Sequence, residues 1–83
     1  CIRFYHDAIA ASVLADEKNE TAAFAADLAK FIDDDVSPLS DLYLRWAHAS
    51  AANDVEAIQA VRDDAQQAGL DSIVRNISPR TVN

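Results

Sequence analysis

The 83-residue sequence has only one cysteine, one glycine and two prolines. A single thiol cannot form an internal disulfide, which excludes a disulfide-stabilised scaffold. Glycine and proline supply many of the turns between β-strands, and no stretch alternates apolar and polar residues for long, so a β-hairpin protein is disfavoured. No apolar run approaches the roughly 20 residues that span a bilayer, and no signal-peptide pattern is visible. We therefore expect a helical protein that does not cross a membrane.

Basic residues are also scarce. Lysines and arginines number 7 against 14 aspartates and glutamates, which gives a formal charge of −7 and a pI near 4.4. Such a charge repels phosphate backbones and anionic lipid headgroups, so binding to nucleic acid or to a membrane surface is disfavoured, and a basic protein partner is favoured. We expect a soluble protein. The compartment cannot be read from the sequence, although the cytoplasm is slightly favoured.

Hydrophobic residues make up 51% of the chain, but many are alanines, which favour helix and contribute little buried area. The large aromatic residues must therefore supply much of the packing: Phe4, Tyr5, Phe24, Phe31, Tyr43 and Trp46. A domain of this length buries only about 60–65% of the surface of its unfolded chain. We expect a thin core and a stability that is modest or shared with a partner, either a second copy or another protein.

The stretch from Ser37 to Asn53 carries the clearest helix signals. Ser37 can accept a hydrogen bond from an unpaired amide of the first turn, and Pro38 at the first helical position sacrifices no hydrogen bond. Apolar side chains then recur at spacings of three and four residues: Leu39, Leu42, Tyr43, Trp46 and Ala49. Because every other segment has an apolar stripe that can pack on this face, we expect this helix at the centre of a bundle.

Two apolar stripes precede the central helix. The first comprises Ile2, Tyr5, Ile9 and Val13, and the second comprises Phe24, Leu28, Phe31 and Ile32. The stripes are in phase, so the pattern predicts either one helix from about residue 2 to 33 or two helices that meet near Asn19. We favour two helices, with Asn19 and Thr21 as cap residues, because the interval is wholly polar and about 30 residues exceeds an ordinary helix length.

Two further helices are predicted after residue 53. Asn53 followed three residues later by Glu56 has the spacing of a capping box. The next apolar stripe comprises Val55, Ile58, Val61, Ala65 and Ala68. Gly69 suits the left-handed residue that ends a helix, with Leu70 folding back onto it. Asp71 is then expected to cap a short final helix that buries Ile73, Val74 and Ile77.

These segments predict an all-α fold, a small antiparallel bundle of four or five helices, because the connections before Ser37 and near Asn53 are short. We expect residues 1–83 to form a single helical domain. The chain begins with Cys1 and ends soon after Ser78 and Pro79, a second helix-start pattern, so we expect a processed chain or a piece of a larger protein. Cys1 as the lipid-bearing residue of a lipoprotein is disfavoured, because a structured segment begins directly after it.

Acidic residues cluster at Asp33, Asp34 and Asp35 and again at Asp63 and Asp64. An EF-hand calcium loop that began at Asp33 would need glycine at its sixth position and glutamate at its twelfth, where the sequence has Pro38 and Leu44. We therefore expect no metal ion at this cluster and no cofactor elsewhere. Both clusters are assigned instead to contact with a basic partner.

His48 offers an alternative function. Ala47 and His48, followed by residues 50–53, resemble the phosphotransfer helix of two-component relays, in which an exposed helical histidine of a four-helix bundle carries a phosphoryl group. The family's lysine and glycine, three and four residues after the histidine, correspond to Ala51 and Ala52 here. Because the lysine that supports the phosphate is absent, a surface histidine without a catalytic role is the simpler interpretation.

Two other resemblances are local. Residues 69–73 are similar to the phosphopantetheine attachment site of acyl carrier proteins, with Ser72 as the attachment point, but only eleven residues follow Ser72. Residues 77–83 are similar to the start of a LuxR-type recognition helix, which the acidic composition does not support. Cys1 with His6 matches neither a metal-binding spacing nor a defensible pair of nucleophile and base.

No catalytic set emerges, so we expect a non-enzymatic protein-binding or regulatory module. An inhibitor or immunity-like protein that masks a basic site is one version, and a subunit of a larger homo- or hetero-oligomeric assembly is another. The alternatives are a phosphotransfer domain that uses His48, a carrier domain that uses Ser72, and a helical cap of a larger enzyme.

Overall fold

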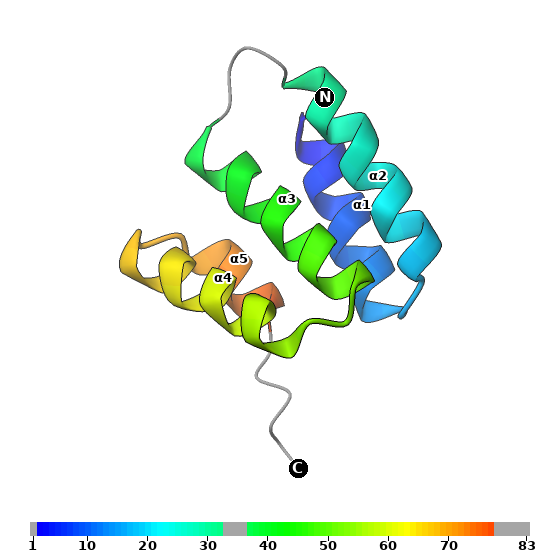
Figure 1. The fold of residues 1–83 in the computed structure, drawn as a ribbon. Helices are drawn as coiled ribbons and strands as arrows, with labels where there is room; N and C mark the ends of the chain where they lie inside the picture. Colours follow the sequence, from blue (N-terminus) through cyan, green and yellow to red (C-terminus); the bar gives the residue numbers. More distant parts are fainter. Residues whose placement is uncertain (1, 33–36, 78–83) are drawn as a thin grey trace.

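The structure, a computed structural model, describes residues 2–32 and 37–77. Within these ranges the chain forms five α-helices and no β-strand (Figure 1). The helices are α1 (Ile2–Leu14), α2 (Lys18–Phe31), α3 (Pro38–Ala51), α4 (Val55–Gln67) and α5 (Asp71–Asn76). The predicted all-α bundle of four or five helices is therefore confirmed.

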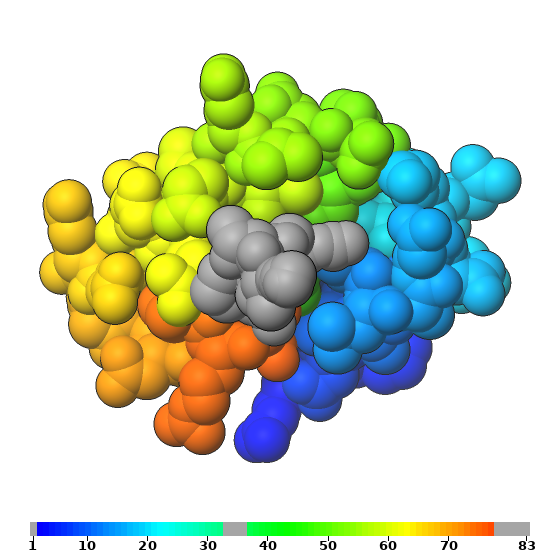
Figure 2. All heavy atoms as spheres, turned by 90° about the horizontal axis from the view of Figure 1, so that it is seen from below, coloured from blue at the N-terminus to red at the C-terminus, as the bar shows by residue number. Residues whose placement is uncertain are grey.

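Helix α3 lies at the centre of the molecule, as its apolar face predicts. The hairpin of α1 and α2 packs along one side of α3, and α4 packs along the other (Figure 1). The short α5 folds back onto α4 and also contacts α3. Seen from below, α1 and α2 (blue to cyan) and α4 and α5 (yellow to orange) lie on opposite sides of the molecule (Figure 2). α3 therefore joins two pairs of helices.

The first turn of α3 forms as its sequence predicts. The Ser37 hydroxyl accepts a hydrogen bond from the amide of Ser40 at 3.1 Å, and Pro38 occupies the first helical position. The buried residues of the helix are Ser40, Leu42, Tyr43, Trp46, Ala47 and Ala49. Trp46 is only 2% exposed, so the single tryptophan is part of the core.

The α1–α2 hairpin turns earlier than predicted. The prediction of two helices in place of one long helix is confirmed, but the break precedes α2 at Asp16, whose φ of 58° is left-handed. A short polar side chain tolerates this conformation, which ends the first helix. The prediction that Asn19 and Thr21 cap the second helix is wrong, because both lie within α2. The Thr21 hydroxyl instead lies 3.1 Å from the carbonyl of Glu17, one turn earlier in the chain.

The start of α4 is shifted by one residue from the prediction. Asp54, and not Asn53, is the cap residue, and its carboxylate accepts a hydrogen bond from the amide of Ala57 at 3.1 Å. Asn53 has a φ of 57° and makes the left-handed turn between α3 and α4. The capping-box prediction for Asn53 and Glu56 is therefore wrong, because asparagine fits both positions and the backbone uses it for the turn.

The end of α4 follows its sequence closely. Gly69 has a φ of 74° and its amide bonds to the carbonyl of Gln66. The amide of Leu70 bonds to the carbonyl of Ala65, and the Leu70 side chain is half-buried against the core. The prediction that Asp71 caps the final helix is wrong: Asp71 is the first residue of α5, and the cap position is Leu70, which makes no side-chain cap bond.

Four residues that the sequence assigns to the core are exposed, and the first of them is Phe4, which is 58% exposed. Phe31 and Val55 are 56% and 66% exposed, and they are the last residue of α2 and the first residue of α4. Ala68, just after α4, is exposed as well. In contrast, Ile73 and Ile77 are buried as predicted. None of the described helices is long and apolar enough to cross a membrane.

Candidate functional site

The acidic residues assigned to partner binding are described only in part. The first cluster, residues 33–35, lies outside the described residues. Asp63 and Asp64 are exposed on α4. Gln59 Nε2 donates to Asp63 at 3.0 Å, and Arg45 Nη2 donates to Asp64 at 2.8 Å. Both α4 carboxylates therefore already have a partner within the chain.

The two candidate attachment residues, His48 and Ser72, are exposed on α3 and α5 respectively. Ala51 and Ala52 follow His48 at the positions where a phosphotransfer helix carries lysine and glycine, so neither supplies a cation for a phosphate. Within residues 2–32 and 37–77, no group of three or more potential metal ligands comes together. Phosphotransfer at His48 and carrier attachment at Ser72 stay predictions from sequence.

An open apolar groove of about 380 Å³ runs along the exposed face of the α1–α2 hairpin. We call it the α1–α2 groove, and its lining residues are Phe4, Ala8, Ala11, Ser12, Ala15, Glu17, Glu20 and Phe24. Large apolar side chains alone do not reveal this groove. The signal in the sequence is a second stripe on the first helix, in which Phe4, Ala8, Ala11 and Ala15 recur at spacings of three and four residues.

Aromatic side chains cover one end of the same hairpin. The ring centroid of Phe4 lies 5.3 Å from that of Tyr5 and 6.4 Å from that of Phe24, both edge to face. Tyr5 in turn lies 5.9 Å from Phe31. Phe4 and Phe31 are 58% and 56% exposed. These four rings form a continuous aromatic patch across α1 and α2, of which Phe4 and Phe24 also line the α1–α2 groove.

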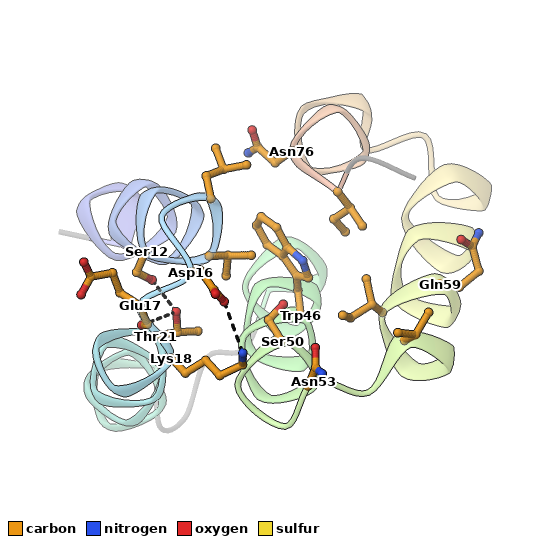
Figure 3. A pocket seen from close by; sticks show the side chains of 15 residues that line it. Ser12, Asp16, Glu17, Lys18, Thr21, Trp46, Ser50, Asn53, Gln59 and Asn76 are labelled. Atoms are coloured by element: carbon orange, nitrogen blue, oxygen red, sulfur yellow. Dashed lines mark hydrogen bonds and ion pairs between the residues drawn. The ribbon is translucent and has the colours of Figure 1, made fainter. Parts of the chain in front are cut away.

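A larger cleft, of about 770 Å³, lies over α3 between the α1–α2 turn and the pair of α4 and α5 (Figure 3). We call it the α3 cleft. Its apolar lining residues are Val13, Leu14, Trp46, Val55, Ile58 and Ile77. The cleft arises because α3 packs against helices on both of its sides, whereas those two pairs do not pack extensively on each other.

Polar groups also face the α3 cleft. Ser50 lies one turn after Trp46 on α3 and borders the same space (Figure 3). The Ser50 hydroxyl is closed off from solvent and has no hydrogen-bond partner among the described residues. At the rim, Lys18 pairs with Asp16 at 3.3 Å, and Glu17 lies between them in the sequence. The rim therefore carries one more negative than positive charge.

A buried polar network connects α1, α3 and α5. His6 Nε2 lies 3.0 Å from Ser40 Oγ, and Asn76 Nδ2 donates to the Tyr43 hydroxyl at 3.1 Å. Burial lowers the pKa of His6 and outweighs the opposing effect of the nearby Asp7 carboxylate. Burial raises the pKa of Tyr43, although the bond from Asn76 acts in the other direction. Both rings are therefore uncharged at neutral pH.

Comparison of the chain with known protein families, with curated proteins and with solved structures finds no match. The groove, the aromatic patch, the cleft and the charges described above are therefore the features of the chain that indicate a function.

Proposed function

We propose that the chain is a non-enzymatic protein-binding module that holds a basic amphipathic helix in the α1–α2 groove. The observation that carries this proposal is the aromatic patch beside the groove, in which Phe4 and Phe31 are each more than half exposed. Large apolar patches are uncommon on proteins without partners, and aromatic side chains contribute a large share of the binding energy at interfaces.

The shape of the groove favours a helical partner. Ala8 and Ala11 on α1, and Ala15 directly after it, present only methyl groups, so a second helix can approach the backbone closely. Ala8 to Ala15 spans about 10 Å of helix axis, close to two turns. Phe4 and Phe24 stand at one end of this floor as aromatic anchors. A partner helix would contact them through side chains on a single face.

Charge defines the other end of the groove. Glu17 and Glu20 line it there, and no lysine or arginine is among the lining residues. The chain as a whole carries a formal charge of −7. Complementary charge favours a partner helix with lysine or arginine near these two carboxylates, and it raises the association rate at low salt. A module of this kind can mask a basic helix of another protein, as an inhibitor or an assembly subunit does.

The proposal can be tested with two synthetic helical peptides that share one apolar face, one with lysine and arginine and the other with glutamate on the polar face. Fluorescence anisotropy measures their binding. We expect the protein to bind the basic peptide and to bind the acidic one at least tenfold more weakly. Ala11→Glu places a charged side chain on the groove floor and should weaken binding of the basic peptide at least tenfold.

Ala29→Glu is the matched control. Ala29 is exposed, lies near the end of α2 as Ala11 lies near the end of α1, and does not line the groove. Because both variants add one negative charge, a general electrostatic effect would strengthen binding of the basic peptide equally in both. Circular dichroism shows that each variant is folded. Equal binding of the two peptides, or equal affinity of the two variants for the basic peptide, would contradict the proposal.

A further inference from the structure

The α1–α2 groove and the α3 cleft meet at the turn between α1 and α2. Ser12 and Glu17 line both of them (Figure 3). Between these two residues, Ala15 lines the groove, whereas Leu14 and Asp16 line the cleft. Neighbouring residues of the turn therefore border the two spaces. A polypeptide that lies in the groove can continue over this turn into the cleft without leaving the surface of the protein.

Two large apolar side chains of the cleft are exposed to solvent. Leu14, the last residue of α1, is 69% exposed, and Val55, the first residue of α4, is 66% exposed. Both line the α3 cleft, and neither lines the groove. In the described part of the chain, the other large apolar residues that are exposed are Phe4 and Phe31 of the aromatic patch. The exposed apolar surface is therefore divided between the aromatic patch and the cleft.

The charge where the groove meets the cleft favours a basic chain. Asp16 pairs with Lys18 at 3.3 Å, but Glu17 has no ion-pair partner within residues 2–32 and 37–77. Lysine or arginine in the last turn of a helix interacts favourably with the macrodipole of that helix. A partner helix with basic residues there would place its C-terminal end beside Glu17 and Glu20, so the residues that follow the helix would reach the cleft.

We infer that the α3 cleft holds an extended apolar segment that follows the partner helix, so that one basic partner occupies the groove and the cleft together. This inference rests on the proposed binding of a basic helix in the α1–α2 groove. It assigns Leu14 and Val55 to contact with the apolar side chains of the segment. Alternate side chains of an extended chain point to the same side, so two large apolar residues separated by one other residue would face the cleft.

Three labelled forms of the basic helical peptide test the inference. The first ends with the helix, the second continues at its C-terminus with two leucines that alternate with two serines, and the third continues with four serines. Fluorescence anisotropy measures their affinities. Because burial of the two leucines is favourable, we expect the second peptide to bind about tenfold more tightly than the first. The third should bind as the first does.

The outcomes separate this inference from the proposed function. Equal affinity of the three peptides would overturn the inference and leave the binding of a basic helix in the groove intact. Failure of all three peptides to bind would overturn both.

Leu14→Ser with Val55→Ser tests the role of the cleft. This double variant should lose the tenfold preference for the leucine extension, and it should bind the helix without an extension as the unmodified chain does. Leu14→Met with Val55→Ile is the matched control, because it keeps an apolar side chain at each position and should keep the preference. Both positions are mostly exposed, so we expect both variants to fold, which circular dichroism checks. A full preference for the leucine extension in the serine variant would overturn the assignment to the cleft.

Discussion

The imidazole ring of His6 lies face to face with the phenol ring of Tyr43, with ring centroids 4.3 Å apart and an interplanar angle of 9°. His6 is 8% exposed and contacts the Ser40 hydroxyl at 3.0 Å, so its ring is enclosed by two side chains of α3. Asn76 donates to the hydroxyl of Tyr43. This arrangement connects the first helix to the last through the central one, and it depends on His6 staying uncharged.

The first prediction concerns the pH dependence of stability. Burial lowers the pKa of His6 below its ordinary value of 6.5, so the unfolded chain takes up this proton at a higher pH than the folded chain does. The contribution of His6 to the free energy of unfolding is therefore complete above about pH 6.5 and is lost progressively as the pH falls through the lowered pKa of the folded state. Urea unfolding between about pH 7.5 and pH 5 measures this decrease.

His6→Phe keeps a planar ring against Tyr43 but removes the titrating group. Its free energy of unfolding should depend less steeply on pH over this range than that of the unmodified chain, although the unpaired Ser40 hydroxyl lowers its absolute stability by about 1–3 kcal/mol. His48→Gln is the control, because His48 is exposed. A pH dependence of His6→Phe equal to that of the unmodified chain would disprove the assignment to His6.

The second prediction concerns the hydroxyl pair of the α1–α2 turn. Ser12 Oγ lies 2.7 Å from Thr21 Oγ1 and 2.9 Å from the carbonyl of Ile9. The Thr21 hydroxyl lies 3.1 Å from the carbonyl of Glu17. Two hydroxyls have only two hydrogens for these three contacts. One hydroxyl therefore donates to the other. The second donates to the carbonyl near it, which is that of Ile9 for Ser12 and that of Glu17 for Thr21. In either direction, these hydrogen bonds connect α1 to α2.

Removal of one hydroxyl leaves the other with a carbonyl acceptor. Ser12→Ala and Thr21→Val should therefore each lower the free energy of unfolding by about 1 kcal/mol, and the double variant should lower it by less than the sum of the two. Urea unfolding of the four proteins in the cycle gives the coupling energy. Strict additivity would mean that the 2.7 Å contact contributes nothing to stability.

Local chemistry explains which parts of this fold the sequence predicts. Ser37 and Gly69 each satisfy a requirement of their own backbone position, a cap acceptor and a left-handed φ, and both are found where predicted. At the start of α4 the chain offers Asn53 and Asp54, and both residue types can cap. Their roles depend on how α4 packs on α3, and the local sequence does not determine this packing. The isolation of the Ser50 hydroxyl depends on packing in the same way.

The third prediction separates the roles of Asn53 and Asp54. Asp54→Ala removes the side chain that accepts from Ala57 and should lower the free energy of unfolding by about 1 kcal/mol. Asn53→Gly should be neutral or stabilising by up to about 1 kcal/mol, because glycine adopts a φ of 57° without steric cost. The opposite pattern, in which Asn53→Gly lowers the free energy of unfolding and Asp54→Ala does not, would support Asn53 as the cap residue, as predicted from the sequence alone.

The fourth prediction concerns the acidic pair on α4. Arg45 and Asp64 form an ion pair at 2.8 Å in which both side chains are at least 40% exposed. Solvent weakens such pairs, so Asp63→Asn with Asp64→Asn should change the free energy of unfolding by no more than about 1 kcal/mol. α4 packs on the side of α3 away from the α1–α2 hairpin (Figure 1). If a basic helix binds in the groove as proposed, these carboxylates would attract it over distance without contacting it.

We therefore expect the α4 double variant to slow association of the basic peptide at low salt and to leave its dissociation rate unchanged. Glu17→Gln with Glu20→Gln removes the same charge from the groove itself and should increase the dissociation rate as well. Stopped-flow fluorescence at two salt concentrations measures both rates. A faster dissociation in the α4 variant, with no effect of the groove variant, would indicate that the peptide binds at the acidic pair predicted from the sequence and not in the groove. The same result would leave the aromatic patch of α1 and α2 without an assigned partner.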